Sequence, residues 1–496
     1  MRKTKKLISL FVTTILSVCS WFTACGDNGN AANAPDYSKN TEKYPIWAYS
    51  QTCDDWYQVD GTRYYFEEGT RQTMENTQLC ADAGFTVLFI DWTFPYHGPE
   101  GFETSKTKRV MDYAYEAGMK AFVFTSLPYS LSTSEESLIN PAKADGVNFF
   151  ETQEQLNDLI AEHLAPLIAH PAFYGCSLKD EPSYKMFEAM GQVYRAIQAA
   201  APGCFVNMNI NPMYDGIEFM YCKEGSSIGL VQAYRKYLES YYEHIGQYAK
   251  YIQYDDYPIL EGKAILPYHL HNAQIVAEFC KEKGMEFGKV FQTCSYDADL
   301  VRVAPTQRDI LWQMNLGMAM GIKNYSYYTY YPVVNTSGGL PDEDATIVNR
   351  VGVPNERYYW LKDIHEDMHF NAKALLNFEY QALNIVTKAP IPGNKSFLQG
   401  ALNASGKLTD IKNITMDSAG IVLTTEQYDK TNNQRGYYVM NLTAPSQATE
   451  IKVTLELEQH KNVQIWDGNQ VTNQKVKDGK VSFRLKTGEG VFVMPY

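Results

Sequence analysis

One pattern recurs along most of the chain and limits the folds available to it. An amphipathic helical segment ends at a glycine, and a short apolar strand follows at once, as in CADAGFTVLFID at Gly84 and YEAGMKAFVFTS at Gly118. Gly284 and Gly321 stand at two similar junctions. Because glycine readily adopts the left-handed conformation in which many helices end, these positions predict helix C-caps. The repeated unit is helix, glycine, strand, which is typical of α/β proteins.

Eight stretches of the chain read as strands, and a helical pattern follows each of them. They span residues 45–51, 85–91, 120–126, 172–180, 204–210, 251–256, 289–296 and 322–330. Eight such units predict a (β/α)8 TIM barrel. An open, doubly wound sheet is the alternative, but the glycine-rich phosphate loop GxGxxG does not follow the first strand.

The hydrophobic period changes from 3.6 to 2 near residue 378. IKVTLELE, at 451–458, alternates strictly, and GYYVMNL, VSFRL and GVFVMPY are further strand-like stretches separated by turn residues. We therefore predict a barrel domain over 44–377 and a small C-terminal all-β sandwich domain over 378–496.

The first residues predict export from the cytoplasm. MRKTKK is basic, and the apolar run that follows it, residues 7–22, is shorter than the ~20 residues that span a bilayer. FTAC, followed by Gly26, resembles the lipobox of bacterial lipoproteins. The resemblance implies a signal peptide over 1–24, lipidation at Cys25, a flexible tether over 25–43 and anchoring to a membrane of the bacterial cell envelope; a plain signal peptide with an incidental cysteine is the alternative.

Charge and cysteine content exclude several classes of function. The formal net charge is −13, which disfavours binding to the phosphates of nucleic acid and suits a neutral or weakly charged substrate. Of the nine cysteines, the seven other than Cys19 and Cys25 are scattered singly without a CxxC motif, and LPYHLH offers only two closely spaced histidines. We expect no metal site and no cofactor.

Two adjacent acids, Asp180 and Glu181 in YGCSLKDEPSYKMF, end the fourth predicted strand. In a TIM barrel, catalytic groups lie at the C-terminal ends of the strands, where Asp91, Asp255 and Asp297 are also found, whereas Glu286 precedes its strand. Since side chains alternate along a strand, Gly175, Ser177, Lys179 and Glu181 should point to the barrel axis, as should Gln253 and Asp255. The competing interpretation is that the acid pair caps the following helix.

The motif KDEP resembles the Asn-Glu-Pro motif of the retaining TIM-barrel glycoside hydrolases, in which the glutamate is the general acid/base. IKNYSYYTYYP, YDDYP and the C-terminal strands are similar to family 42-like proteins of gut bacteria. The chain departs from the family pattern in two places: Asp180 replaces the asparagine, and the seventh strand ends in QTCSYD without the glutamate that serves as nucleophile.

The resemblance implies a glycoside hydrolase in which Glu181 is the general acid. Asp255 is the predicted second carboxylate, with Asp297 as the alternative, because glycosidic cleavage requires two carboxyl groups. The adjacent Asp180 and Glu181 also resemble the pair of the chitobiase-like, substrate-assisted hexosaminidases. A non-catalytic glycan-binding lipoprotein on a TIM-barrel scaffold is the third possibility.

A further set of residues is predicted to bind the carbohydrate. Polar side chains at strand ends would bond sugar hydroxyl groups, and aromatic rings would stack on sugar rings. The set comprises Asp180, Asp91, Trp47, Trp92, Asn209, Tyr257, Gln292 and Tyr327.

Overall fold

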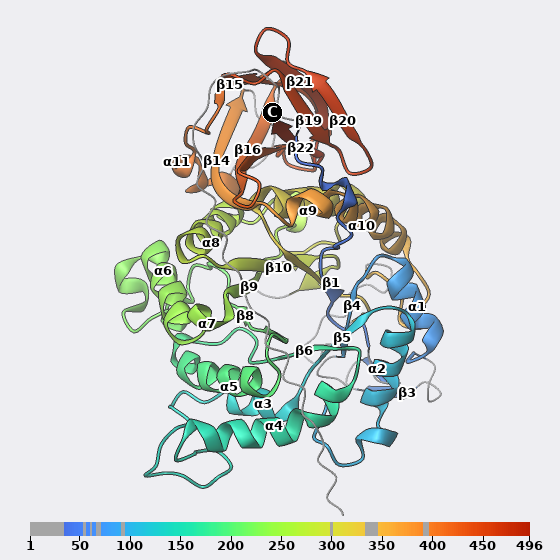
Figure 1. Ribbon diagram of the computed structural model, residues 1–496, viewed down its shortest axis with the longest axis vertical. Coiled ribbons are helices and arrows are strands. Elements are labelled where there is room, and N and C mark those ends of the chain that lie inside the picture. The colour runs from blue at the N-terminus through green and yellow to red at the C-terminus, as the bar shows by residue number, and fades with distance from the viewer. Residues whose placement is uncertain are drawn as a thin grey trace, which may run out of the picture. The chain divides into compact units, whose positions relative to one another are not determined.

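A closed ring of parallel strands forms the centre of the computed structural model (Figure 1). Backbone hydrogen bonds give the order β4-β5-β6-β7 in one sheet and β8-β9-β10-β13-β1 in the other. Their bounds are β1 (Ile46–Ala48), β4 (Val87–Ile90), β5 (Lys120–Val123), β6 (Phe173–Ser177), β7 (Phe205–Asn207), β8 (Asn209–Ile210), β9 (Tyr251–Asp255), β10 (Glu286–Gln292) and β13 (Asn324–Tyr328).

Two junctions turn these sheets into one barrel. Only Met208 separates β7 from β8, so together they form a single bent strand. Between β1 and β4, the Thr86 amide donates to the Ile46 carbonyl at 3.0 Å, and the Ile46 amide donates to Thr86 Oγ1 at 2.8 Å. The predicted (β/α)8 TIM barrel is therefore confirmed, with all eight strands in the predicted order.

The structure describes residues 34–52, 56–59, 62–65, 71–90, 95–297, 301–332, 346–389 and 396–496. The predicted signal peptide and Cys25 lie outside these residues. No helix in the described ranges combines the length and the apolar character needed to cross a bilayer.

Helices cover the outside of the barrel. They are α1 (Met74–Asp82), α2 (Lys106–Glu116), α3 (Ser126–Leu131), α4 (Gln153–Ala169), α5 (Phe187–Ala200), α6 (Leu230–Tyr241), α7 (Gln247–Ala249), α8 (His269–Lys283), α9 (Gln307–Met320) and α10 (Glu356–Leu375). Gly284 and Gly321 are left-handed C-caps of α8 and α9, as predicted. Two short antiparallel pairs complete this part: β2 (Trp56–Val59) with β3 (Thr62–Tyr65), and β11 (Tyr296–Asp297) with β12 (Val301–Arg302).

An aromatic cluster fills the barrel interior. Trp47, Phe89 and Phe122 pack together with ring centroids 5.1–5.4 Å apart, and Trp47 Nε1 donates to Asn324 Oδ1 at 2.8 Å. Val87 completes this buried group. The barrel is thus solid at its middle, and any ligand must bind at one of its two mouths.

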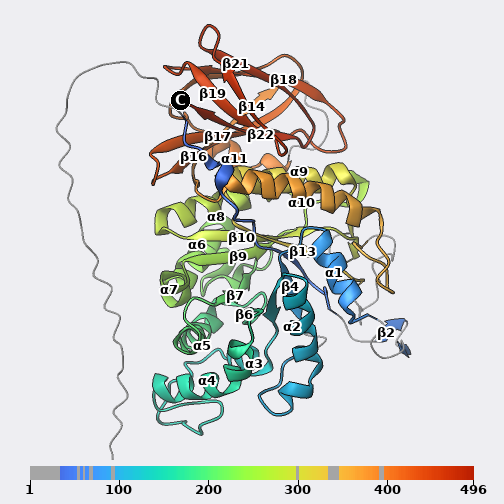
Figure 2. The same cartoon turned by 45° about the vertical axis from the view of Figure 1, so that its right-hand side comes forward.

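After α10 the chain forms two antiparallel sheets, with the short helix α11 (Ala401–Ala404) between strands (Figure 2). One sheet has the order β14-β16-β17-β22-β19-β20, and the other β15-β18-β21. The strands are β14 (Glu379–Lys388), β15 (Ile411–Met416), β16 (Gly420–Asp429), β17 (Gln434–Asn441), β18 (Glu450–Leu457), β19 (Asn462–Trp466), β20 (Val471–Lys475), β21 (Lys480–Lys486) and β22 (Gly490–Pro495). Apolar side chains such as Val439, Val453 and Leu455 share one buried cluster, as in the predicted all-β sandwich.

Buried hydrogen bonds join the larger of these sheets to α9. Thr425 Oγ1 and Gln427 Nε2 donate to the Ala319 carbonyl at 2.5 and 3.0 Å, and the Tyr438 hydroxyl donates to Asn315 Oδ1 at 2.5 Å. Trp312 Nε1 donates to the Leu442 carbonyl at 3.3 Å. The carbonyl groups at the end of α9 are therefore satisfied by side chains from the sandwich.

Gly175 in β6 provides a test of the strand packing. A Cβ atom at this position would lie 1.7 Å from the Phe205 carbonyl oxygen, so the backbones of β6 and β7 would have to separate. We expect Gly175→Ala to reduce the free energy of unfolding by more than about 3 kcal/mol, measured by denaturant unfolding.

Gly406→Ala is the matched control. The nearest atom to its added Cβ would be 3.9 Å away, and the backbone has no positive φ there. Its stability should stay within about 1 kcal/mol of the wild type. Equal stability of the two variants would contradict the close approach of β6 and β7.

Candidate active site

A cavity of about 500 Å³ opens at the C-terminal ends of the barrel strands. Residues from β4, β6, β7, β8, β9 and β13 and from the segments that follow the strands form its wall. They are Tyr49, Ser50, Phe89, Phe124, Tyr129, Ser177, Leu178, Asp180, Asn207, Asn209, Asp255, Tyr257 and Tyr328. The cavity therefore lies at the mouth where TIM-barrel enzymes carry their active sites.

The strand register agrees with the predicted alternation up to the end of β6. Gly175 pairs with Phe205 and Ser177 with Asn207, and Ser177 and Asn207 both line the cavity. Cys176 and Leu178 belong to the buried cluster between the strands and the helices. On β9, Asp255 lines the cavity as predicted.

Beyond Ser177 the alternation breaks. The Leu178 amide donates to the Asn207 carbonyl at 2.9 Å, and the next such bond runs from the Glu181 amide to the Asn209 carbonyl at 2.8 Å. Lys179 and Asp180, which lie between these two bonds, leave the regular strand. Asp180 and Glu181 are both exposed, but only Asp180 is among the described residues that line the cavity.

The backbone at Glu181 is held in an unfavourable conformation. Its φ angle is +46°, in the left-handed region that costs a residue other than glycine about 1 kcal/mol or more. The next carbonyl, that of Pro182, accepts hydrogen bonds from the Tyr237 hydroxyl at 2.6 Å and from Asn211 Nδ2 at 3.0 Å. These bonds fix the KDEP segment against α6 and the end of β8.

The alternative that the acid pair caps a helix is wrong. The 3₁₀ turn Tyr184–Met186 has Ser183 as its N-cap, and α5 has Met186. Neither cap has a side-chain hydrogen bond, and Asp180 Oδ1 instead accepts from Asn209 Nδ2 at 3.0 Å.

Three carboxyl groups influence one another at this mouth of the barrel. Burial, followed by the charges of Glu181 and Asp180, raises the pKa of Asp255 well above its ordinary value. Burial also raises the pKa of Asp180, although its hydrogen bond from Asn209 opposes the shift. Hydrogen bonding to Tyr257 and Asn209 favours the ionised form of Asp255. The group therefore retains protons at a pH where separate carboxyl groups would be ionised.

Glu181 belongs to the same electrostatic group. The pKa of Glu181 is raised to about 7, mainly because surrounding protein atoms displace water from its carboxyl group and secondly because of the charge of Asp180. The charges of Lys179 and Arg302 lower this pKa in part. A carboxyl group with this pKa is partly protonated at neutral pH, which is the state required of a general acid.

Three predicted binding residues lie away from the cavity. Trp47 is 1% exposed in the barrel interior, and Tyr49, two residues further along the same face of the chain, forms the cavity wall in its place. Tyr327 faces the helices, where its hydroxyl contacts His365 Nε2 at 2.9 Å, so the inward neighbour Tyr328 lines the cavity. The Gln292 side chain is bonded to the backbone of Ile259 and Val303. We correct the prediction for these three residues.

The remaining predicted residues divide into two groups. Asp180, Asn209, Asp255 and Tyr257 line the cavity together. Asp91 and Trp92 lie outside the described residues, as does the side chain of Asp297.

Sequence reasoning missed Tyr49, which lies among the three carboxyl groups. Burial and then the charges of Asp180, Asp255 and Glu181 raise its pKa well above the ordinary value. Its position at the C-terminal end of the first strand, two residues after Trp47, is the signal that could have identified it. Arg302 was also missed; its guanidinium donates to the Tyr214 hydroxyl at 3.3 Å.

Asp256, next to Asp255, has a different environment. It is 1% exposed on the helix-facing side of the strand end, and its Oδ2 lies 2.6 Å from His269 Nδ1. Lys289 Nζ is 3.9 Å from the same oxygen. Among the residues that the structure describes, no group of three or more His, Cys, Asp or Glu side chains could hold a metal ion.

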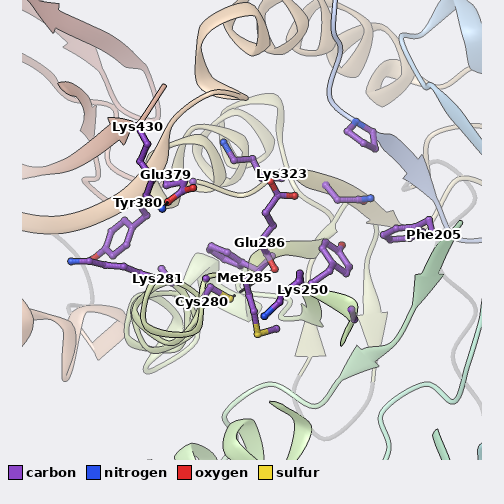
Figure 3. Close-up of a pocket in the computed structure, with 18 of the residues that line it drawn as sticks. Phe205, Lys250, Cys280, Lys281, Met285, Glu286, Lys323, Glu379, Tyr380 and Lys430 are labelled. Carbon is purple, nitrogen blue, oxygen red and sulfur yellow. Dashed lines mark hydrogen bonds and ion pairs between the residues drawn. The ribbon is translucent and has the colours of Figure 1, made fainter. Parts of the chain in front are cut away.

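A second cavity of about 500 Å³ lies at the opposite mouth (Figure 3). Glu286, at the start of β10, is one of its lining residues together with Lys250 and Lys323. Lys323 Nζ already donates to the carbonyls of Leu375 and Phe378 at 2.6 and 2.5 Å. Glu286 is the first residue of β10 and does not precede the strand as predicted, but it lines the cavity at the opposite mouth and not the first one.

No protein-family model and no curated protein matches the chain. Similar solved structures include a family 39 glycoside hydrolase from the gut symbiont Bacteroides cellulosilyticus WH2, with 10% identity over 85% of this chain and 78% of that chain and a TM-score of 0.41. An endo-β-1,4-mannanase from Thermotoga petrophila has 11% identity over 91% and 99% of the two chains, with a TM-score of 0.41. An α-amylase from Anoxybacillus has 10% identity over 91% and 97%, with a TM-score of 0.47. Likeness at this level says nothing about the substrate or mechanism of this chain.

The raised pKa of Asp255 predicts a pH-dependent effect on stability. A carboxyl group whose folded pKa exceeds its unfolded pKa weakens the fold once the pH is high enough to ionise it. We expect Asp255→Asn to be more stable than the wild type at about pH 8, with a free energy of unfolding higher by about 1 kcal/mol or more.

The difference should shrink towards zero at about pH 4, where the carboxyl group is protonated in the folded state. Denaturant unfolding at both pH values measures it, and Glu286→Gln at the opposite mouth is the control. A lower stability of Asp255→Asn at about pH 8 would contradict the unfavourable burial of this charge.

Proposed function

We propose that this protein hydrolyses O-glycosidic bonds of oligo- or polysaccharides. The observation that carries the proposal is a cavity in the C-terminal mouth of the barrel that is lined by the carboxyl groups of Asp180 and Asp255, with Glu181 near enough for its charge to raise the pKa of Asp255. Glycosidic cleavage needs one carboxyl group that donates a proton and another that attacks the sugar or activates water. Aromatic rings beside these groups suit the apolar faces of sugar rings.

Glu181 is the proposed general acid. With a pKa of about 7, it holds a proton in part of the molecules at neutral pH and gives it to the leaving oxygen. The bonds of the Glu181 amide and the Pro182 carbonyl fix the backbone from which this carboxyl group extends.

Asp255 is the proposed second carboxylate. The productive arrangement has the proton on Glu181 and the negative charge on Asp255. Burial and the charges of Glu181 and Asp180 raise the pKa of Asp255 and oppose this distribution, and the hydrogen bonds with Tyr257 and Asn209 offset part of that effect. Asp180, oriented by Asn209, would accept hydrogen bonds from substrate hydroxyl groups.

The leaving group provides a direct test of the role of Glu181. We expect Glu181→Gln to lower kcat for aryl glycosides with poor leaving groups about 100-fold to 10,000-fold, because glutamine cannot donate the proton. The loss should be smaller for dinitrophenyl glycosides, whose leaving group needs no protonation. Steady-state kinetics on a panel of aryl glycosides measures both.

Glu188→Gln is the control, since Glu188 is exposed on the adjacent helix α5. In the wild type, kcat should also fall as the pH rises above about 7, when Glu181 loses its proton, and this limb should disappear in Glu181→Gln. Equal turnover of poor leaving groups by Glu181→Gln and wild type would remove Glu181 from the mechanism.

We also propose that the N-terminal segment is processed to a lipid anchor at Cys25, on the basis of the FTAC motif and the apolar run before it. Expressed in a bacterium with its full N-terminal sequence, the wild type should sediment with membranes, whereas Cys25→Ala should be released from them. Immunoblots of the two fractions provide the measurement. Identical fractionation of both proteins would contradict lipidation at this cysteine.

A further inference from the structure

The cavity contains a group of oxygen atoms that lack hydrogen-bond partners. They are Ser177 Oγ, Asn207 Oδ1, Asn209 Oδ1 and Asp255 Oδ1, none of which has a partner among the described residues. Their side chains are only 4–7% exposed, yet all four residues line the cavity. Buried polar atoms are normally satisfied, so these four indicate where a ligand would bond.

Strand pairing places the four oxygens on one continuous surface. Ser177 pairs with Asn207 across β6 and β7, and Asn209 pairs with Gln253, two residues before Asp255, across β8 and β9. Neighbouring strands are about 4.8 Å apart, so these residues span a width comparable to a single sugar ring.

Three of the four unpartnered atoms are amide or carboxyl oxygens, which accept hydrogen bonds. Asn209 directs its amide nitrogen to Asp180 Oδ1 at 3.0 Å, which leaves its oxygen for a ligand. When it is ionised, Asp255 can only accept hydrogen bonds, and the hydroxyl of Ser177 can accept or donate. A sugar hydroxyl brings one donor together with acceptor lone pairs, whereas an ammonium group brings three donors and no acceptor.

The carboxyl groups around the cavity favour the same kind of ligand, because a cation bound beside them stabilises their ionised forms against the burial that raises their pKa values. Its described lining contains the carboxyl groups of Asp180 and Asp255 and no lysine or arginine. Lys179 precedes Asp180 in the sequence. Its amine donates to the Asp180 carbonyl at 2.5 Å and lies over the Tyr129 ring. The charge of Arg302 also acts on Glu181.

Partly exposed aromatic rings form the remaining wall. Tyr328 packs against Tyr49 and Tyr257, with ring centroids 6.3 and 5.4 Å apart, and Tyr49 packs against Phe89. A cation is attracted to the faces of such rings, particularly where water is excluded.

From this acceptor surface, its carboxyl groups and the aromatic wall, we infer that the sugar bound in the cavity carries a free, protonated amine. The substrate class is a glycoside of an amino sugar that is not N-acetylated. This inference rests on the proposed function, which supplies the cleavage of the glycosidic bond. Binding of the amine can be measured without that cleavage. An acetamido group fits the surface less well because it is neutral and adds a carbonyl acceptor.

Calorimetric titration of the wild-type protein with monosaccharides tests the inference without catalysis. The probes are glucosamine, galactosamine and mannosamine, each compared with its neutral parent sugar and its N-acetyl derivative at about pH 6, where the amine is protonated. We expect at least one amino sugar to bind about 10-fold or more tightly than both of its counterparts, which corresponds to about 1.4 kcal/mol. Asp255→Asn should abolish this preference, and Glu286→Gln at the opposite mouth should retain it.

Equal or tighter binding of the neutral or N-acetylated sugars would overturn the inference, as would the absence of binding by all three amino sugars. A preference for N-acetyl derivatives would instead favour the substrate-assisted hexosaminidase mechanism. If the protein prefers amino sugars but hydrolyses no aryl glycoside, including aryl glucosaminides, the proposed function fails and the recognition of the amine is retained. Hydrolysis of neutral glycosides without that preference would retain the function and refute only the inference.

Discussion

Two backbone hydrogen bonds decide what the barrel can do chemically. They join the amides of Leu178 and Glu181 to the carbonyls of Asn207 and Asn209, and they leave Lys179 and Asp180 outside the regular strand. Without this excursion, alternation would direct Asp180 towards the helices. With it, Asp180 enters the cavity and Glu181 stays close enough to Asp255 for its charge to raise the pKa of Asp255.

The fold could be predicted from the sequence because its signals are local and repeated. The glycine junctions at Gly284 and Gly321 depend on backbone conformation alone, and both are left-handed helix caps in the structure. Alternation along β6 and β9 also placed Ser177 and Asp255 correctly, since both belong to regular or nearly regular strand segments. The same rule failed at Asp180, where hydrogen bonds to a neighbouring strand replace the local pattern.

The aromatic residues show a different limit of sequence reasoning. Trp47 and Tyr49 lie on the same face of one strand segment. Trp47 is buried deeper in the barrel, whereas Tyr49, nearer the mouth, lines the cavity. Tyr327 and Tyr328 are adjacent and point in opposite directions, so a shift of one residue exchanges a helix contact for a cavity contact. Depth and register both follow from how the eight strands are staggered, which no single segment encodes.

The bonds between the sandwich and α9 have a consequence for the evolution of this chain. Thr425, Gln427 and Tyr438 satisfy polar groups of α9 that would otherwise be buried without partners. A recombination event that exchanged the C-terminal sheets for an unrelated module would leave those groups unbonded, even if the new module folded well by itself. We therefore expect descendants of this gene to inherit both parts together and to diversify by substitution around the mouth of the barrel.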